Sequence, residues 1–541
     1  MSLPPPAGAE AVGFPVAWPD PSDAELTWDL DDMHMPFALS PLAGDYSLAI
    51  GMGWASRYTR LGLPITVRTA MWNGYMYFAL RYDAPEAEHD GIETRVTALA
   101  RDHAGIARRY WDHDARPELD AIYGRLGDLT AATMTLTEAR DAWIEAWALV
   151  ERVWRIHFYA IIGPYQVLDD LADLYDAVVT DASPGEALRL LGGSIDVLHE
   201  VEAGLRRLTG LALAEPALAA RLIAPDAPAL DDLAGLPGYA AFCAAWEAML
   251  AAHGHLGQGF DDLALASWAE EPRQLMAELA VRVRRGVVAP AGRAAGLSSD
   301  ADALADKVRD LLADRPAERG RFEALLELAR QVGPLTEAHN YWIDRKVQAL
   351  LRRFVLHIGA LLMDAGVLAE AADVLYLYRD EVPALLQAPA DRRDLVLRRR
   401  GDHAAWRLMR APRQLGKIAP PSANRFEGAR LEPDADDQLR GTGASAGIVR
   451  GPARVTLSTS DFGRVQPGDI IVCPSSNPSW VPVFTIAGGL VTNTGGVLSH
   501  AAVVAREFGL PAVVGVVGAT TRIADGRTLE IDGTLGIVRL L

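Results

Sequence analysis

One long tract limits the fold of this chain more than any other feature. From about Glu93 to Arg413, apolar residues recur at three- and four-residue spacing, Ala, Leu, Arg and Glu are abundant, and alternating segments are few. This pattern predicts a large helical domain. The residues before Glu93 are instead rich in Trp, Pro and Gly, and the aromatic and β-branched run around Asn73-Gly74 predicts a strand or a hairpin.

The helical period ends near residue 415. Residues 416–440 are polar, rich in Pro and Gly and without periodicity, so we interpret them as a linker. From 441 to 541, short β-branched runs alternate with turns, and one strong helix runs from about His500 to Phe508. The predicted fold class is multidomain, α and α/β. A mostly helical domain that opens with a small β element occupies 1–415, and a small α/β domain occupies 441–541.

Composition excludes several classes of function. The chain has 541 residues and a net charge of -19, which disfavours a protein that binds the phosphate backbone of nucleic acid. Its cysteines, Cys243 and Cys473, each lie in an apolar run, so neither a disulfide framework nor a cysteine metal site is indicated. The sequence shows neither a signal-peptide pattern nor an uninterrupted apolar run of about 18 residues. We expect a cytoplasmic protein without a nucleic-acid or membrane partner.

The stretch TNTGGVLSHAAVVAREFGLPAVVGV, which starts at Thr492, holds a single histidine, His500. Its paired glycines allow a sharp bend, Ser499 stands at the N-cap position of a helix, and Gly509 ends that helix. His500 therefore lies in the first turn, where unpaired N–H groups and the positive end of the helix dipole gather. This environment favours a neutral, nucleophilic imidazole and suits an arriving phosphate. We predict that His500 carries a phosphoryl group.

Together with GIVRGPARV, GDIIVCPSSNPSWVPVF and DGRTLEIDGTLGIV, this stretch resembles the swivelling phosphohistidine domain of phosphoenolpyruvate-utilising enzymes over about residues 435–541. The resemblance implies a swivelling β/β/α domain in which His500 accepts a phosphoryl group from one domain and passes it to a substrate in another. It also implies a set of supporting residues around the phosphohistidine: Thr494, Gly495, Gly496, Ser499 and Arg506. The alternative is an ordinary surface histidine in a degenerate copy of the domain.

The helical tract is similar, more loosely, to the substrate-binding region of rifampicin phosphotransferases, through AAHGHLGQGFDDLALASWAEEPRQL and LTEAHNYWIDRKVQALLRRF. Leu256 stands where relatives often have an arginine, so the role of that arginine is not carried over. We find neither an ATP-grasp pattern before residue 90 nor a pyruvate barrel. The resemblance to phenylphosphate synthase, which has separate subunits, then implies that an ATP-grasp partner subunit binds ATP and Mg²⁺.

Histidines near aromatic residues are candidates for binding the acceptor, because a hydroxyl acceptor needs a base, a cation for the phosphoryl group and an apolar wall. Trp154 and His157 belong to a stripe of tryptophans at three- and four-residue steps. The stripe suits a pocket for an aromatic or terpenoid molecule, and it suits equally well a helix core that contains a hydrogen-bonded histidine.

His253 and His255 lie in a segment broken by glycines, which can present polar side chains at a cleft. Two histidines two residues apart do not share a helix face, so we predict acceptor binding or base chemistry there and no metal site. His34, beside Asp32 in a loop with a nearby proline, is a weaker candidate of the same kind.

Four basic residues suggest a further candidate surface. His339, Lys346, Arg353 and His357 are separated by seven, seven and four residues, which predicts one stripe along a straight helix. Such a stripe would meet the phosphorylated His500 when the mobile domain docks. A solvated helix face is the alternative explanation.

These features predict a phosphotransferase component that depends on ATP. It would shuttle a phosphoryl group on His500 from a separate nucleotide-binding partner to the hydroxyl of a small apolar alcohol or phenol. Two alternatives stay open: a phosphocarrier or regulatory protein that catalyses nothing, and a dehydratase or lyase that acts through a transiently phosphorylated alcohol.

Overall fold

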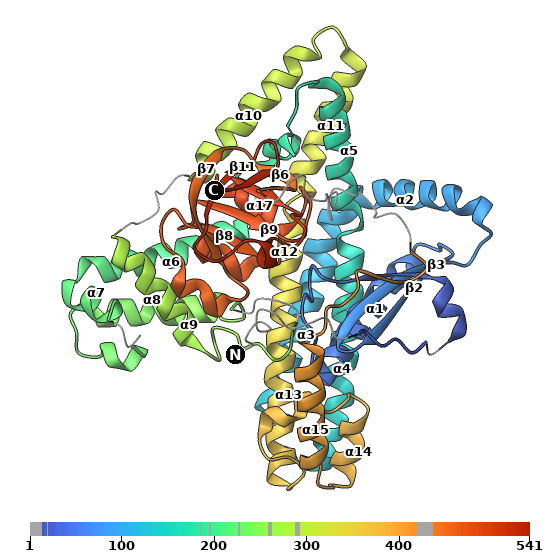
Figure 1. Cartoon of the computed structure of the whole chain (residues 1–541), viewed down its shortest axis with the longest axis vertical. Helices are drawn as coiled ribbons and strands as arrows, with labels where there is room; N and C mark the ends of the chain where they lie inside the picture. Colours follow the sequence, from blue (N-terminus) through green and yellow to red (C-terminus); the bar gives the residue numbers. More distant parts are fainter. Residues whose placement is uncertain are drawn as a thin grey trace. The chain divides into compact units, whose positions relative to one another are not determined.

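The computed structural model describes residues 13–18, 20–183, 185–193, 196–224, 228–257, 262–286, 293–418 and 437–541. The chain divides into two compact units. The first consists of Met1–Ile162, Phe260–Leu265 and Trp342–Pro420, and the second of Gly163–Gly259, Ala266–Tyr341 and Pro421–Leu541. The predicted fold class, mostly helical with a small α/β domain at the C-terminal end, is confirmed (Figure 1).

Helices form most of the first unit. They are α1 (Pro41–Arg60), α2 (His89–Tyr110), α3 (Arg116–Ala131), α4 (Leu136–Ala160), α13 (Lys346–Asp364), α14 (Glu381–Gln387) and α15 (Arg393–Trp406). Shorter turns are η1 (Pro21–Glu25), η2 (Glu86–Glu88) and η7 (Ala371–Tyr376), and two segments are π-helical, η3 (Trp111–Ala115) and η6 (Asn340–Arg345). Helix α4 begins at a capping box in which Thr135 and Glu138 bond each other's backbone amides.

A four-stranded antiparallel sheet completes this unit. Its strands are β1 (Thr27–Leu30), β2 (Ile65–Trp72), β3 (Tyr75–Tyr82) and β4 (Gln414–Gly416), in the order β2-β3-β1-β4. The predicted hairpin is confirmed, because β2 and β3 are joined by Asn73 and Gly74 with φ angles of 52° and 76°. Positive φ at both positions is what a two-residue turn of the I′ type requires.

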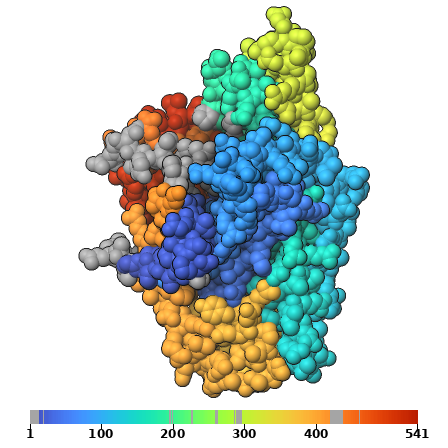
Figure 2. Space-filling view, turned by 90° about the vertical axis from the view of Figure 1, so that its right-hand side faces the viewer, coloured from blue at the N-terminus to red at the C-terminus, as the bar shows by residue number. Residues whose placement is uncertain are grey.

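Strand β4 returns the end of the helical tract to the N-terminal strands. The hydroxyl of Tyr75 donates to the carbonyl of Met409 at 3.1 Å, and that of Tyr77 donates to Pro412 at 2.6 Å. In Figure 2 the surface of the N-terminal segment, in blue, adjoins the gold surface of α13 to α15. The predicted linker 416–440 therefore starts and ends in strand residues, and its residues 419–436 lie outside the described ones.

Helix α1 was not predicted, since the sequence before Glu93 indicated only the small β element. Its glycines allow close packing. A Cβ at Gly51 would lie 2.2 Å from Thr69 Cγ2 on β2, and one at Gly53 would lie 2.6 Å from Trp154 Cβ on α4. The contacts that these glycines permit offset their low helix propensity.

The second unit has a helical part and a β-rich part. The helical part contains α5 (Ile162–Val178), α6 (Asp196–Ala214), α7 (Pro216–Leu222), α8 (Tyr239–His253), α9 (Pro272–Arg285), α10 (Arg293–Leu311), α11 (Pro316–Val332) and α12 (Leu335–His339), with the 3-10 turns η4 (Glu186–Leu191) and η5 (Leu230–Leu233). Across the described residues, no helix is both long enough and apolar enough to cross a lipid bilayer.

The β-rich part, which we call the C-terminal domain, is an eight-stranded sheet in the order β5-β12-β11-β7-β8-β9-β10-β6. Its strands are β5 (Gln438–Arg440), β6 (Thr442–Ser445), β7 (Ile448–Val455), β8 (Ile470–Cys473), β9 (Gly489–Thr492), β10 (Ala512–Val514), β11 (Thr528–Asp532) and β12 (Ile537–Leu540). The pairs from β7 to β10 are parallel and the others antiparallel. Its helices are η8 (Thr459–Arg464), η9 (Pro478–Trp480), α16 (Val481–Phe484), α17 (His500–Glu507) and α18 (Ala519–Arg522), and α17 confirms the predicted helix.

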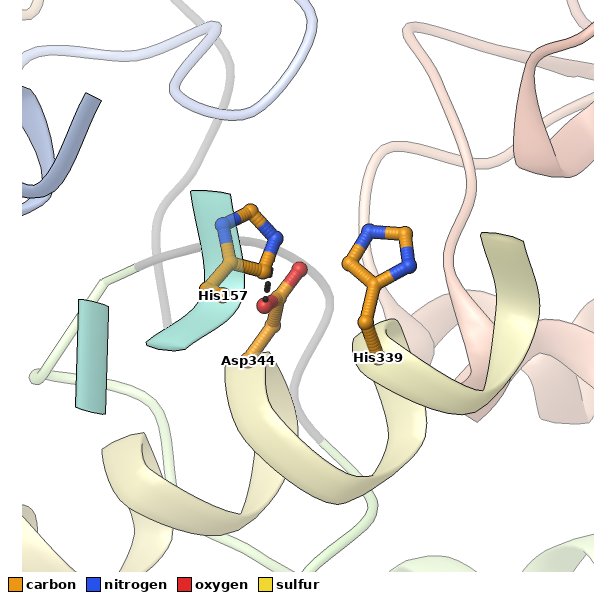
Figure 3. A group of neighbouring side chains, drawn as sticks. All are labelled: His157, His339 and Asp344. Atoms are coloured by element: carbon orange, nitrogen blue, oxygen red, sulfur yellow. Dashed lines mark ion pairs between the residues drawn. The ribbon is translucent and has the colours of Figure 1, made fainter. Parts of the chain in front are cut away.

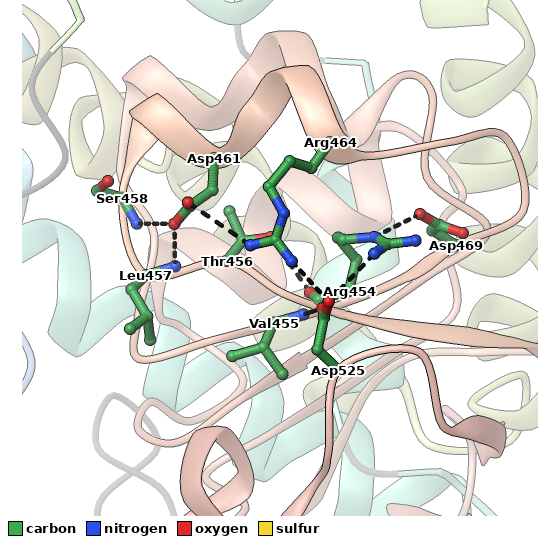
Figure 4. Close-up of polar contacts among 9 residues, drawn as sticks. All are labelled: Arg454, Val455, Thr456, Leu457, Ser458, Asp461, Arg464, Asp469 and Asp525. Carbon is green, nitrogen blue, oxygen red and sulfur yellow. Dashed lines mark hydrogen bonds and ion pairs between the residues drawn. The ribbon is translucent and has the colours of Figure 1, made fainter. Parts of the chain in front are cut away.

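A polar network fastens η8 and β7 to the loop before β11 (Figure 4). Asp525 accepts hydrogen bonds from Arg464 Nη2 at 2.5 Å, from the amide of Val455 at 2.9 Å and from Arg454 Nη1 at 3.2 Å. Arg454 also donates from Nε to Asp469 at 3.0 Å. Since these bonds join segments distant in sequence, they help the C-terminal domain to behave as one body.

Candidate functional site

The turn before α17 is fixed by local hydrogen bonds. The hydroxyl of Thr494 donates to the carbonyl of Pro474 at 3.2 Å, and its carbonyl accepts a bond of 2.7 Å from Thr492 Oγ1. Gly495 has a φ of 102°, and a Cβ there would lie 2.7 Å from Ser499 Oγ. Because this backbone conformation and this spacing exclude a side chain, the turn requires glycine at residue 495.

Ser499 occupies the N-cap position of α17, as predicted, but its side chain does not cap the helix. Its hydroxyl instead donates to the carbonyl of Gly496 at 2.8 Å. The serine therefore stabilises the turn, and this corrects the prediction of a capping hydroxyl. The bond forms because the tight bend at Gly495 and Gly496 carries the Gly496 carbonyl back over the helix start.

His500, the first residue of α17, faces a carboxylate from the helical part. Its Nδ1 lies 2.5 Å from Glu337 Oε2 of α12, and the two side chains are 7% and 1% exposed. A carboxylate can only accept, so Nδ1 carries the hydrogen and the lone pair of the neutral ring lies on Nε2. Nε2 is buried and has no hydrogen-bond partner among the described residues. The geometry presents Nε2 as a nucleophile.

Arg506, on the last turn of α17, donates from Nη1 to the carbonyl of Ala444 on β6 at 3.1 Å. Burial lowers its pKa to about 10, although Glu507 and Glu337 oppose the shift. The guanidinium is therefore charged at neutral pH. It fastens α17 to β6 and lies within electrostatic range of the carboxylate that holds His500.

Two further contacts join the C-terminal domain to the helical part of the same unit. Glu507 accepts hydrogen bonds from the amide of Gly193 at 3.2 Å and from His199 Nε2 at 3.1 Å. The amide of Gly257, which follows α8, donates to Ser479 Oγ at 3.0 Å. We call this arrangement, in which His500 contacts Glu337, the docked arrangement.

A buried ionic cluster provides the most extensive of these contacts. Arg282 of α9 donates to both carboxylate oxygens of Glu202 on α6, at 3.0 and 2.9 Å. The same guanidinium donates to the carbonyl of Pro482 at 3.2 Å and to Thr485 Oγ1 at 2.7 Å. Glu278 Oε1 lies 4.0 Å from Arg282 Nε, and both side chains are buried. Arg282 thus joins two helices to the C-terminal domain.

We expect Glu278 to make stability depend on pH. Burial raises its pKa to about 8 from an ordinary value of 4.5, although Arg282 opposes the shift, and Glu202 adds to it. Between these values the folded chain binds more protons than the unfolded chain, so the free energy of unfolding falls as pH rises. Glu278→Gln should remove this slope and raise stability above about pH 8 by a few kcal/mol, on the order expected for a buried carboxylate.

Urea unfolding of the unmodified chain and of Glu278→Gln between about pH 4 and pH 9 checks this result, since that window includes both the ordinary pKa of 4.5 and the raised pKa of about 8. Glu200→Gln is the control, because Glu200 lies on α6 but is exposed. If the free energy of unfolding of Glu278→Gln falls with pH as steeply as that of the unmodified chain, another group is responsible for the pH dependence.

His253 and His255 both contact Tyr341. The distance from His253 Nδ1 to the Tyr341 hydroxyl is 2.6 Å, and that hydroxyl donates to the carbonyl of Ala252 at 3.0 Å. The His255 ring meets the Tyr341 ring edge-on with centroids 4.6 Å apart. Burial lowers the pKa of His253, so its ring is neutral at neutral pH.

The tryptophan stripe of α4 lies in the core of the first unit. Trp154 is 1% exposed, and the His157 ring packs edge-on against it at 5.0 Å. His157 Nε2 forms an ion pair of 3.3 Å with Asp344 Oδ1 of η6 (Figure 3). His34, in contrast, is exposed, and Asp31 holds its ring with a bond of 2.9 Å.

The predicted stripe along a straight helix is wrong for His339. The π-helical segment η6 separates α12, which carries His339, from α13, which carries Arg353 and His357. Because the π-helical segment interrupts the helix, His339 does not share one straight helix with the others, whereas Lys346, Arg353 and His357 all lie on α13 at the predicted spacing. His339 is buried with Nδ1 2.9 Å from the carbonyl of Leu335, Arg353 is exposed, and His357 is half-buried.

The site residues that sequence reasoning missed are Glu337, Tyr341 and Arg282. Glu337 lies in the quoted segment LTEAHNYW, between Thr336 and Ala338, and its local sequence does not distinguish it from an exposed carboxylate. Arg282 and Glu202 resemble surface charges in the sequence, because their pairing joins helices that are distant along the chain.

Comparisons with known families agree with this geometry. Residues 465–536 match the mobile domain of PEP-utilising enzymes, and residues 160–337 match the fourth domain of rifampicin phosphotransferase. The predicted resemblance is therefore confirmed, and His500 lies within the mobile domain. Glu337 is the last residue of the second match, so the pair of His500 and Glu337 joins the two matched regions.

Individual relatives share these regions. The chain is 31% identical over 561 residues to chondramide synthase cmdD of Chondromyces crocatus, which covers 98% of this chain and 14% of that protein. It is 34% identical over 231 residues to the uncharacterized phosphotransferase YvkC of Bacillus subtilis, covering 42% of this chain and 28% of that protein. A rifampicin phosphotransferase of a Streptomyces species is 34% identical over 323 residues, covering 58% of this chain and 36% of that protein. The chain thus spans much less than two thirds of each relative.

Proposed function

We propose that this chain, which contains a PEP-utilising mobile domain and a segment similar to the fourth domain of rifampicin phosphotransferase, carries a phosphoryl group on His500 to a small-molecule acceptor. The observation that carries the proposal is the bond between His500 Nδ1 and Glu337, which leaves Nε2 as the nucleophile. The relatives named as phosphotransferases support this class of reaction.

In the first step, the Nε2 lone pair of His500 attacks the phosphorus of a nucleotide donor. The P–N bond forms as the P–O bond to the leaving phosphate breaks, and the electron pair leaves with that oxygen. The ring then carries both a phosphoryl group on Nε2 and a hydrogen on Nδ1, and so it is cationic. Once the C-terminal domain has returned to the docked arrangement, Glu337 stabilises this cation, because a carboxylate beside an imidazolium forms a hydrogen bond assisted by charge.

In the second step, a hydroxyl oxygen of the acceptor attacks the phosphorus. The P–N bond breaks, its electron pair returns to Nε2, and a base takes the hydroxyl proton. His253 and His255 are the base candidates in the unit that holds His500, and the lowered pKa of His253 leaves its ring free to accept a proton. The acceptor that we propose is a small apolar alcohol or phenol.

The docked arrangement is suited to the second step. His500 is 8% exposed and contacts Glu337 in the helical part, so a nucleotide donor has little access to it there. The C-terminal domain would leave this position to receive the phosphoryl group from an ATP-grasp partner or domain that binds ATP and Mg²⁺, and would return to deliver it. Movement of one domain between two sites is the behaviour that the term mobile domain describes.

Labelling tests this function. The chain, Mg-ATP labelled at the β or γ phosphate and a candidate ATP-grasp protein are incubated together, and then a panel of alcohols and phenols is added. We expect a label on the chain that is labile in acid and stable in base, as a phosphoramidate is, and its loss when the acceptor is supplied. Label stable in acid, or label that no acceptor removes, would contradict the proposal.

A further inference from the structure

A cavity of about 240 Å³ lies between η4, α10 and the C-terminal domain in the second unit. Its walls include Gly185 and Leu297 from the helical part and Leu498 and Val503 from the C-terminal domain. His500 is not among the residues that line it. The cavity is therefore separate from the reacting nitrogen, and both parts of the unit are needed to form it.

The size and the walls of the cavity suit an apolar body. Leucines and Val503 supply much of the lining, and cavities of about 150 Å³ hold a benzene ring. A volume of 240 Å³ admits a somewhat larger body with one short polar arm.

Two carboxylates that line the cavity, Glu186 and Glu507, already accept hydrogen bonds from the protein. Glu186 accepts hydrogen bonds from the amide and the hydroxyl of Ser183 at 3.0 Å and from the Tyr175 hydroxyl at 2.9 Å. Glu507 accepts from Gly193 and His199. The hydrogen-bonding capacity of these two groups is thus directed toward the protein.

The side-chain groups of the cavity wall that remain available for hydrogen bonding are mainly donors. Arg506 uses Nη1 for the Ala444 carbonyl, and an added Cβ at Gly185 would lie 3.7 Å from that nitrogen, which places the guanidinium against the cavity wall. Arg189 of η4 is exposed, and among the described residues no acceptor is seen for its side chain. Asp300 on α10 is the third lining carboxylate, and it is exposed.

We propose that this cavity binds a small organic acid with an apolar body, whose carboxylate accepts hydrogen bonds from Arg189 and Arg506 and whose body contacts Leu297, Leu498 and Val503. The site goes beyond the phosphoryl transfer proposed above. Because the helical part and the C-terminal domain both contribute walls, an occupant stabilises the docked arrangement by its binding free energy. The ligand is therefore an effector of domain docking.

The binding of two matched probes tests this site. We expect 3-phenylpropionate to bind the full chain about tenfold more tightly than 3-phenylpropanol, since the probes differ mainly in the group that meets the arginines. Arg189→Gln should remove this preference, and Asp300→Asn should strengthen binding of the acid by relieving repulsion. Leu297→Trp should block both probes by filling the cavity. Calorimetry measures the affinities.

Hydrogen exchange shows where the probe lies. Bound 3-phenylpropionate should slow exchange in residues 185–192 and 498–509 together, because these segments face each other across the cavity. Arg319→Gln is the control, since Arg319 is exposed on α11 and does not line the cavity. Equal affinity for the acid and the alcohol, affinity unchanged in Arg189→Gln, or protection of only one segment would overturn the proposal, and so would absence of binding.

Discussion

Replacing His500 by alanine is expected to abolish phosphorylation of the chain. The substitution removes Nε2, the atom that attacks the donor phosphorus in the first step and carries the phosphoryl group into the second. The label from Mg-ATP should fall to background, a loss of several orders of magnitude, as is usual when a covalent nucleophile is removed. Mass spectrometry of the intact chain detects the added phosphoryl group, and the resistance of the label to base identifies it as a phosphoramidate.

Stability needs a separate control, because His500→Ala leaves the buried Glu337 carboxylate without its bond. This costs about 1–3 kcal/mol. His500→Gln keeps a donor for Glu337 and lacks the nucleophilic ring, so it should fold as the wild type does and also remain unlabelled. Ser499→Ala should retain labelling, since its hydroxyl bonds only the Gly496 carbonyl. Label that persists in His500→Gln, or moves to Ser499, would refute the assignment of His500.

Removing the guanidinium of Arg282 is expected to destabilise the chain more than removal of any surface charge. Arg282→Ala leaves Glu202 buried without its cation and also breaks the bonds to Pro482 and Thr485. Breaking one partner of a buried ion pair typically costs about 3–5 kcal/mol. The midpoint of urea unfolding at neutral pH should fall accordingly, and α17 should exchange its amides faster as docking weakens.

A matched surface pair provides the comparison. Arg309 also donates to both oxygens of a carboxylate, that of Glu323, but these side chains are 28% and 41% exposed. Arg309→Ala should therefore cost less than about 1 kcal/mol. The double variant Arg282→Met with Glu202→Leu should recover much of the loss, because no uncompensated charge is left buried. An Arg282→Ala variant no less stable than Arg309→Ala would show that the cluster contributes nothing to docking.

Sequence alone determined the features that depend on local backbone preference and on periodicity. Asn73-Gly74 indicated the hairpin because these residues tolerate the positive φ that the turn requires. The glycine pair, Ser499 and Gly509 indicated the position of α17, since each residue type suits one place at a turn or a helix end. The order of these residues around His500 was also sufficient to indicate the resemblance to the mobile domain of PEP-utilising enzymes, which the match over 465–536 confirms.

Tertiary structure decided which side chains meet. Glu337 and His500 are 163 positions apart, and nothing in the local sequence of either shows that the other lies beside it. The same holds for Arg282 and Glu202, which resemble solvated charges until their helices pack. Helix α1 formed in a region rich in glycine because contacts with Thr69 and Trp154 outweigh weak propensity. Local patterns report the conformational preference of a segment, whereas the pairing of distant segments depends on the packing of the whole unit.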